Sequence, residues 1–203
     1  MYIAKRINDR THMARQALLA ALVALCAALA AGSAAADPVV KFSPEISIDG
    51  RTVPLRGTGR LVWMKLVTVY DAALYLPMDV AAKDVLTDVP KQLELSYHVS
   101  IEGHKFGESA TPFLEKNVPQ DTLAMLKPRI EQLNKLYRDV KEGDRYALTY
   151  APGKGTTLSL NNAPLGTIEG ADFAAAYYAI WLGAKPISDS MRDELTGLKK
   201  KRK

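Results

Sequence analysis

The 203-residue chain has little cysteine and histidine, with one cysteine, Cys26, and three histidines. Cys26 lies in an N-terminal apolar run, so the rest of the chain can form no disulfide and offers no thiol nucleophile. The sequence also lacks a Gly-rich phosphate loop, a Gly-x-Ser-x-Gly elbow and a His-x-x-x-His pair. The histidines after that run, His98 and His104, are six residues apart, and we interpret them as surface or core residues. We therefore expect no catalytic residue, no metal and no cofactor.

The N-terminus has the three-part layout of a secretory signal peptide. Basic residues precede an uncharged Ala/Leu/Val run over residues 17–31, and small residues follow up to Ala36. That run is about fifteen residues long, short of the roughly 20 needed to span a bilayer, which favours a cleaved leader over an anchor. The pattern predicts that residues 1–36 are removed after Ala36 and that the protein is periplasmic. Either Met1 or Met13 can be the true start.

Positive charge is concentrated at the two ends of the chain. Lys and Arg number 27 against 22 Asp and Glu, but residues 37–198 hold more acidic than basic side chains. The last five residues, 199–203, are all basic and contain nothing apolar to pack, so we expect a disordered tail. Such a tail suits weak contact with an anionic membrane, and nucleic acid is not an expected partner of an exported protein. Residues 37–198 are enough for one monomeric domain without internal repeats.

Short segments rich in β-branched and aromatic residues predict a series of strands. An Asp49-Gly50 turn joins the first pair, because these residues tolerate the positive φ angles of a tight hairpin. Asn161-Asn162 joins the last pair, and Gly57-Thr58-Gly59 indicates a bulge or a close backbone approach rather than a nucleotide loop. The predicted strands cover residues 45–48, 51–53, 55–63, 66–76, 93–99, 145–150, 156–160 and 165–168.

Helices are predicted between and after these strands. An apolar stripe over residues 123–140 predicts one kinked helix or two short ones, because Pro128 interrupts it. Asp172 is the expected cap of an apolar helix over residues 173–182, and Ser188 or Ser190 begins a last amphipathic helix. Strands followed by helices, twice over, predict an α+β domain with helices covering one face of an antiparallel sheet.

Five segments in a fixed order resemble the bacterial chalcone isomerase-like family over roughly residues 44–198. They are residues 57–61, 69–76, 93–98, 143–146 and 173–186, which read GTGRL, VYDAALYL, LELSYH, GDRY and FAAAYYAIWLGAKP. The resemblance implies an open-faced β-sandwich of the chalcone isomerase type, a large antiparallel sheet covered by helices. It also implies a ligand cleft between the sheet and the helices.

The resemblance does not extend to the polar groups with which chalcone isomerases close a flavanone ring. Those enzymes use an Arg and a Thr from strands, a Tyr and an Asn on one helix, and a hydroxyl residue on a late helix. The corresponding positions here hold Arg60 or Arg56, then Tyr70, Phe106, Phe113 and Ala174. Because phenyl rings and a methyl group replace donors and acceptors, such a site cannot polarise the same substrate.

A different use of the same cleft is an anion clamp. A hairpin turning around Met64-Lys65-Leu66 sets Arg60 opposite Tyr70, and the two side chains then converge on a carboxylate through charge-assisted hydrogen bonds. Fatty-acid-binding members of the wider fold use an Arg and Tyr pair in this sense, as the resemblance implies. The alternative is that Arg60 pairs with an acid or reaches solvent, and that Tyr70 is a core aromatic residue.

We therefore expect an exported, non-catalytic protein that binds a small amphipathic carboxylate, namely a fatty acid. Arg60 and Tyr70 are the candidate head-group ligands, and Trp63 and Tyr97 are candidates for the cleft wall. Two rival functions stay open. One is an intramolecular lyase or isomerase acting on an unknown conjugated substrate, and the other is a structural module of the envelope without a ligand.

Overall fold

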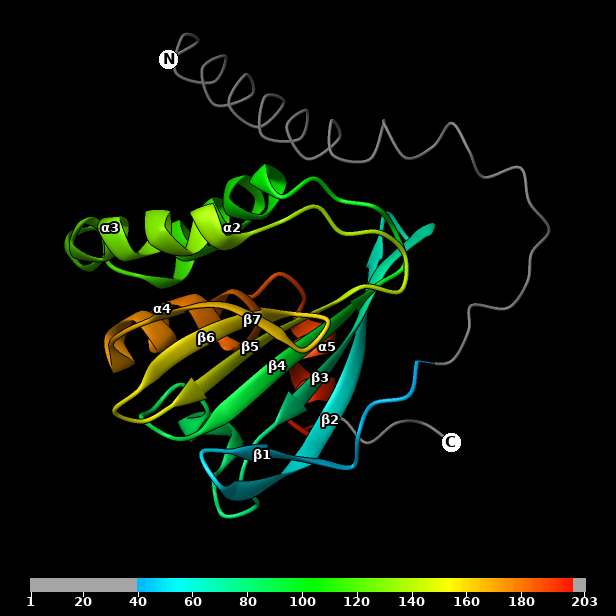
Figure 1. The fold of residues 1–203 in the computed structure, drawn as a ribbon, viewed down its shortest axis with the longest axis horizontal. Helices are drawn as coiled ribbons and strands as arrows, with labels where there is room; N and C mark the ends of the chain where they lie inside the picture. The colour runs from blue at the N-terminus through cyan, green and yellow to red at the C-terminus, as the bar shows by residue number, and fades with distance from the viewer. Residues whose placement is uncertain (1–39, 199–203) are drawn as a thin grey trace, which may run out of the picture. The chain divides into compact units, whose positions relative to one another are not determined.

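The structure is a computed structural model that describes residues 40–198, so the predicted leader and basic tail lie outside the described residues. A seven-stranded antiparallel sheet forms the centre of the described part, in the strand order β1-β2-β3-β4-β5-β6-β7 (Figure 1). The strands are β1 Glu45–Ile48, β2 Arg51–Trp63, β3 Val67–Tyr75, β4 Lys91–Tyr97, β5 Arg145–Ala151, β6 Gly155–Leu160 and β7 Ala163–Ile168. The helices are the 3-10 turn η1 Ala82–Asp84, α2 His104–Asn117, α3 Gln120–Leu136, α4 Ala171–Leu182 and α5 Asp189–Leu195.

Each strand pairs with the next one along the chain, and tight turns close several of the hairpins. Asp49 and Gly50 have φ angles of 49° and 76°, and Asn161 and Asn162 have 49° and 69°, which confirms both predicted turns. β1 also contacts β5, so the sheet curls into a half-barrel. The antiparallel α+β architecture predicted from the sequence is confirmed. No helix among residues 40–198 is long and apolar enough to cross a bilayer.

The two faces of the sheet bury different residues. On β3, Tyr70, Ala72 and Leu74 point to the side covered by the helices, where the main hydrophobic core lies. Figure 1 shows α2 and α3 as a layer over this side, with α4 between them and the sheet. Ala73 and Tyr75 point to the other side and pack in a smaller cluster with residues of β1 and β2. The face on which a strand residue lies therefore decides which surroundings its side chain meets.

α3 runs through Pro128 as a single helix, which excludes the predicted alternative of two short helices. The helices differ from the sequence prediction at two points. The periodicity of the sequence did not predict α2, which only the family resemblance implied. Asp172 is not the cap of α4: the cap is Gly170 at φ 103°, and the Asp172 carboxylate pairs with Arg129 at 2.6 Å. Ser188 does cap α5, since its hydroxyl accepts a hydrogen bond from the backbone N–H of Met191 at 3.3 Å.

Gly57 and Gly59 allow α5 to lie directly on β2. A Cβ atom on Gly57 would come within 2.2 Å of the Glu194 carbonyl oxygen, and one on Gly59 within 2.7 Å of the Met191 side chain. A register shift between Leu55 and Gly57 marks a bulge at the same place. The interpretation of this segment as a bulge and a close backbone approach is confirmed.

Candidate functional site

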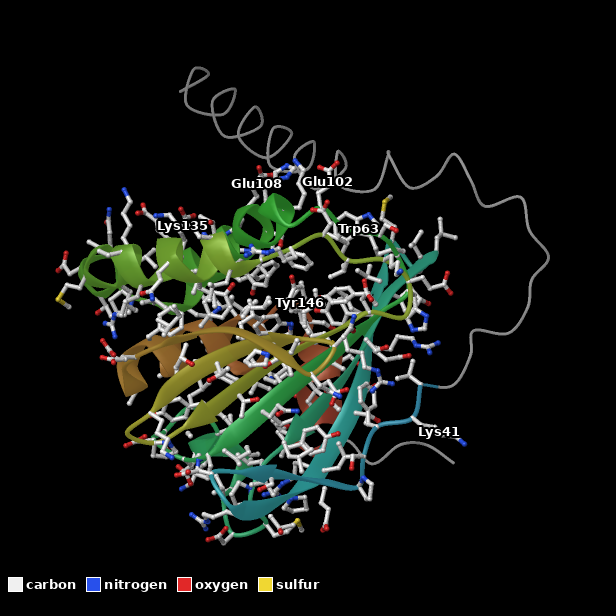
Figure 2. All side chains as sticks on the ribbon, viewed as in Figure 1. Lys41, Trp63, Glu102, Glu108, Lys135 and Tyr146 are labelled. Atoms are coloured by element: carbon white, nitrogen blue, oxygen red, sulfur yellow. The ribbon has the colours of Figure 1, made fainter. Side chains whose placement is uncertain are left out.

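Aromatic side chains fill the space between the helices and one end of the sheet. Phe106 of α2 stacks on Tyr137 with ring centroids 4.7 Å apart, and it meets Tyr97 of β4 edge-on at 5.7 Å. Tyr70 of β3 meets Tyr97 at 5.8 Å, and Tyr177 of α4 lies 6.2 Å from Trp181. We call this set the aromatic layer; its members are Tyr70, Tyr97, Phe106, Tyr137, Tyr146, Tyr177 and Trp181. Figure 2 shows Tyr146 between the helix pair and the sheet.

The hydroxyl group of Tyr70 is held in a fixed orientation. Trp181 donates its indole N–H to Tyr70 Oη at 3.0 Å, so the Tyr70 proton must point elsewhere. Burial raises the pKa of Tyr70 well above its usual value, and the hydrogen bond from Trp181 offsets only part of that effect. Tyr70 therefore stays protonated at neutral pH and acts as a hydrogen-bond donor within the layer.

The other hydroxyl groups of the layer fall into two kinds. Tyr146 is satisfied by backbone, accepting from Arg138 N at 2.7 Å and donating to Arg138 O at 2.9 Å. Tyr137 and Tyr177 share one hydrogen bond of 2.9 Å, and burial raises the pKa of Tyr177 to about 12. Within residues 40–198 the Tyr97 hydroxyl has no hydrogen-bond partner, although the side chain is almost completely buried. Tyr97 is thus an unused donor and acceptor beside Tyr70.

Trp63 lies farther along β2 on the same side of the sheet. It is two residues beyond Leu61, which packs against the main core, so it continues that face. Its indole N–H is buried and has no partner among the described residues. A buried donor left unpaired costs about 1–3 kcal/mol, so this group is a place where a bound molecule gains a hydrogen bond. Figure 2 shows Trp63 toward the hairpin end of β2, beyond Tyr146.

The predicted pairing of Arg60 with Tyr70 is wrong by one residue. The predicted register holds at the hairpin end, where Val62 faces Thr68, but a bulge then shifts it. Arg60 consequently lies opposite Asp71, and Tyr70 lies opposite Leu61. Because neighbouring residues of a strand point to opposite faces, the Arg60 guanidinium and the Tyr70 hydroxyl lie on different sides of the sheet. A ligand role for Arg60 stays a prediction, but this pair does not form the expected clamp.

Arg60 instead belongs to a charged cluster on the far face. Its Nε and Nη2 donate to the two carboxylate oxygens of Asp71 at 2.7 and 3.0 Å, and His98 Nε2 lies 2.8 Å from Asp71 Oδ2. Burial of Asp71 opposes its ionisation, but the hydrogen bonds from Arg60 and His98 outweigh burial and lower its pKa below the usual range. The alternative that Arg60 pairs with an acid is therefore confirmed. Of the predicted site residues, Tyr70 and Tyr97 are in ring contact on the helix side, Trp63 lies farther along β2, and Arg60 lies on the other face.

Comparisons with known proteins place this arrangement in a family. The family model described as chalcone isomerase-like matches residues 37–197. The chain belongs to the chalcone isomerase-like family. Among solved structures, the crystal structure of a fatty-acid binding protein from Arabidopsis thaliana has a similar fold, with a TM-score of 0.60 and 15% sequence identity. The match covers 76% of this chain and 90% of the plant chain, and no curated protein sequence matches this one.

In this chalcone isomerase-like protein, the positions that correspond to the enzyme's polar groups lie on the helix side of the sheet, except Arg60, which lies on the other face. Tyr70 and Ala174 are buried in the main core, and Phe106 and Phe113 pack against it. The aromatic layer presents rings and a few phenol and indole donors there in place of the enzyme's helical Tyr and Asn.

The sequence reasoning missed Tyr137, Tyr177 and Trp181 as members of this site. Tyr177 and Trp181 are four residues apart and therefore on one face of α4, and this spacing is a signal that the sequence does contain. Tyr137 follows α3 directly; the apolar stripe over residues 123–140 includes it, but only the tertiary packing shows that it reaches the layer.

The chalcone isomerase-like domain also buries a lysine at the opposite end of β4. Lys91 Nζ donates to the carbonyl oxygens of Thr87 and Val89 at 2.7 and 3.0 Å and lies over the rings of Tyr150 and Tyr178. Burial lowers the pKa of Lys91 to about 8, against a smaller opposing effect of Asp88. These contacts fix the loop before β4, so we assign Lys91 to the structure of the fold and not to the aromatic layer.

Neither histidine lies in a metal-binding group. Within residues 40–198, no three His, Cys, Asp or Glu side chains are close enough to hold a metal ion. His98 binds Asp71, while His104 is exposed at the start of α2 beside Glu102 and Glu108, both labelled in Figure 2.

Proposed function

We propose that this protein binds a small amphipathic carboxylic acid, a fatty acid, with its head group at Tyr70 and Tyr97 and its chain along the aromatic layer. The observation that carries the proposal is the donation from Trp181 Nε1 to Tyr70 Oη beside the unpartnered hydroxyl of Tyr97. This arrangement leaves two phenol groups able to bind an oxygen-rich head group inside surroundings that are otherwise apolar. The similar fold of a plant fatty-acid binding protein supports a ligand of this class.

The electrostatics of the layer indicate how such a head group is held. Within residues 40–198, the hydrogen bonds of its hydroxyl groups go to other aromatic side chains or to backbone, and none goes to a Lys or Arg side chain. An ionised carboxylate buried without a cation is costly. The hydroxyl groups of Tyr70 and Tyr97 are two donors that reduce this cost. Trp63 supplies a third donor through its unpartnered indole N–H.

The pKa values of the buried tyrosines favour binding over ring-closing catalysis. General acid–base chemistry needs a group whose pKa lies near the working pH. Burial instead raises the pKa values of Tyr70, Tyr97 and Tyr177 further from neutrality, which keeps these phenols protonated. Protonated phenols suit the recognition of an acid head group better than proton transfer.

The rings of the layer touch one another, so a ligand chain needs some of them to move. Phe106 is the best candidate, because it is only partly buried and lies on α2, whose packing partners are mainly other helices. We expect binding to displace Phe106 from its stack on Tyr137. Trp181 lies in the same layer, so its fluorescence should report the event.

The test compares a free fatty acid with its methyl ester by titration calorimetry. Tyr70→Phe should raise the Kd for the acid about 3- to 10-fold, the equivalent of one hydrogen bond, and Tyr97→Phe should do the same. Tyr146→Phe is the matched control, since its hydroxyl group bonds only to the backbone of Arg138. This control variant should lose stability and keep the preference of the wild type for acid over ester.

The same titration separates the two possible head-group sites. Arg60→Met should leave the Kd unchanged if the head group lies at Tyr70 and Tyr97, because Arg60 lies on the other face. A Kd that rises only in Arg60→Met would refute the assignment to the aromatic layer. No binding of either the acid or the ester by the wild type would refute the proposed function itself.

Export to the periplasm is part of the proposal. The layout of residues 1–36, with a basic start, an apolar run and small residues before Asp37, supports it. An extracytoplasmic binding protein for fatty acids would work next to the bilayers in which such ligands dissolve.

A further inference from the structure

The tip of the β2–β3 hairpin, which we define as residues 62–66, exposes a group of apolar side chains. Val62, Met64 and Leu66 are 44%, 72% and 85% exposed, and they lie within five consecutive residues. The other large apolar side chains that are exposed among residues 40–198 are far apart in the sequence: Met78, Met125 and Leu198. Single exposed apolar side chains are ordinary on a protein surface, but a group of them marks an interaction site.

The tip stands beyond the rest of the sheet. β3 pairs with β4 only from Tyr70 onward, whereas its pairing with β2 continues to the Trp63 and Val67 pair. The last part of the hairpin therefore lacks a third strand. Figure 1 shows the β2–β3 hairpin reaching past its neighbours at the upper right of the sheet.

The backbone conformation of the tip does not explain why Met64 and Lys65 stand there. Met64 and Lys65 have φ angles of 49° and 59°, left-handed values that favour Asn and Gly and strain other side chains. Among the described residues, Asp49-Gly50 and Asn161-Asn162 adopt positive φ angles in two-residue hairpin turns, whereas three residues, 64–66, separate Trp63 from its partner Val67. The tip thus holds a methionine and a lysine where the turn itself favours neither. Strain of this sort is kept where the side chains serve a function.

The composition of the tip fits one kind of partner. From Leu61 to Tyr70 the chain has a single charged residue, Lys65, and no acidic residue. Apolar side chains with a tryptophan and a lysine are typical of segments that enter the interface of a bilayer with anionic lipid. A stable protein interface needs about 800 Å² per partner, more than a five-residue turn offers on its own.

We propose that the tip of the β2–β3 hairpin inserts into the surface of a bilayer that carries anionic phospholipid. Met64 and Leu66 enter the acyl boundary, and Lys65 lies among the head groups. This inference does not depend on the identity of the ligand. If the aromatic layer binds a fatty acid, the same two strands lead from the bilayer to that site, since Trp63 is on β2 and Tyr70 is on β3.

The experiment uses a local reporter, because the apolar residues 17–31 can bind vesicles by themselves. In the full chain with Cys26→Ser, an environment-sensitive fluorophore is attached at Leu66→Cys or, as a matched control, at Met125→Cys, an exposed site on α3. Vesicles of phosphatidylglycerol and phosphatidylcholine are then added. We expect the label at position 66 to shift to the blue and to be shielded from an aqueous quencher, with no change at position 125.

Two substitutions then test the side chains of the tip. Met64→Asn replaces an apolar group by a residue that tolerates the left-handed conformation, so it should keep or raise the melting temperature and weaken vesicle binding about tenfold. Lys65→Asn should weaken binding to the anionic vesicles about fivefold and leave binding to pure phosphatidylcholine unchanged. A structural role for Met64 would instead lower the melting temperature and leave vesicle binding as it was.

Three outcomes would overturn the proposal. The first is equal quenching of the labels at positions 66 and 125 in the presence of vesicles. The second is shielding at position 66 that rises with protein concentration in the absence of lipid, since a second copy of the chain would then cover the tip. The third is equal binding of the wild type to both kinds of vesicle, which would overturn the choice of an anionic surface.

Discussion

Replacing Asp71 by Ala tests the charged cluster that separates Arg60 from the aromatic layer. The Asp71 side chain is only 12% exposed, and it accepts from Arg60 at 2.7 and 3.0 Å and lies 2.8 Å from His98 Nε2. Removing one partner of a buried ion pair costs about 3–5 kcal/mol. Arg60 is 38% exposed and can turn to solvent, which reduces the expected loss to about 2 kcal/mol. For a domain of this size that is a fall in Tm of about 4–8 °C.

The pH dependence identifies the ionised carboxylate as the cause. The pKa of Asp71 is lowered in the fold, so its contribution is present above the unfolded pKa and is lost as pH falls through the folded value. Chemical denaturation of wild type and Asp71→Ala should therefore differ by a constant free energy between about pH 5 and pH 7. The difference should shrink below about pH 4.

Arg60→Met is the companion variant, and it should cost at least as much as Asp71→Ala, because it leaves the Asp71 carboxylate, 12% exposed, with only His98 beside it. The reasoning fails if Asp71→Ala is as stable as wild type at pH 7. It also fails if the difference between the two proteins grows as the pH falls.

Three further predictions concern other parts of the chain. The free energy of unfolding should rise from about pH 8 to pH 9.5, because the pKa of Lys91 is lowered to about 8 in the folded protein. Over this range the unfolded state binds more protons than the folded state, so raising the pH favours folding. Denaturant titrations at these pH values should show no such rise in Lys91→Met. Gly57→Ala should lower the Tm strongly, since the new Cβ would lie 2.2 Å from the Glu194 carbonyl oxygen. Gly153→Ala is the matched control, because a Cβ there has no atom within 4 Å and the variant should cost only the strain of its φ of 74°. Identical melting curves for the two variants would contradict this prediction. Protein recovered from an exporting host should begin at Asp37 by N-terminal sequencing, and an intact Met1 or Met13 in the envelope fraction would refute the predicted leader.

Much of the fold follows from local sequence signals. Asp49-Gly50 and Asn161-Asn162 supply positive φ angles where two hairpins turn, and alternation along β4 places Leu93, Leu95 and Tyr97 on the core face. The periodicity analysis missed helix α2, although α2 buries two residues, Ala110 and Leu114, just as α3 does; Gly107 and Pro112 inside α2 are residues typical of turns.

The sequence identified two residues of the aromatic layer, Tyr70 and Tyr97, but neither the other members of the layer nor its geometry. Tyr70, Tyr97 and Trp63 do share one side of the sheet, as aromatic residues at alternating strand positions suggest. The error lies in the register, since a β-bulge between Leu61 and Val62 adds one residue to β3 and no local pattern in the sequence marks it. A shift of one residue exchanges the faces of a whole strand, so a small error in pairing moved Arg60 to the wrong side.

That bulge links the charged cluster, the aromatic layer and the hairpin tip. By inserting one residue in β3 before Tyr70, it sets Arg60 against Asp71 and leaves the layer with neutral donors. Bulges also increase the local twist of a strand pair, which turns the last residues of a hairpin away from the sheet. One local feature thus removes a cation from the helix side. A ligand with a long apolar chain that leaves a bilayer would have to pass any charged group that lay between the tip and the site. A neutral site behind an apolar tip avoids this, which supports treating the tip and the aromatic layer as parts of one route for the ligand.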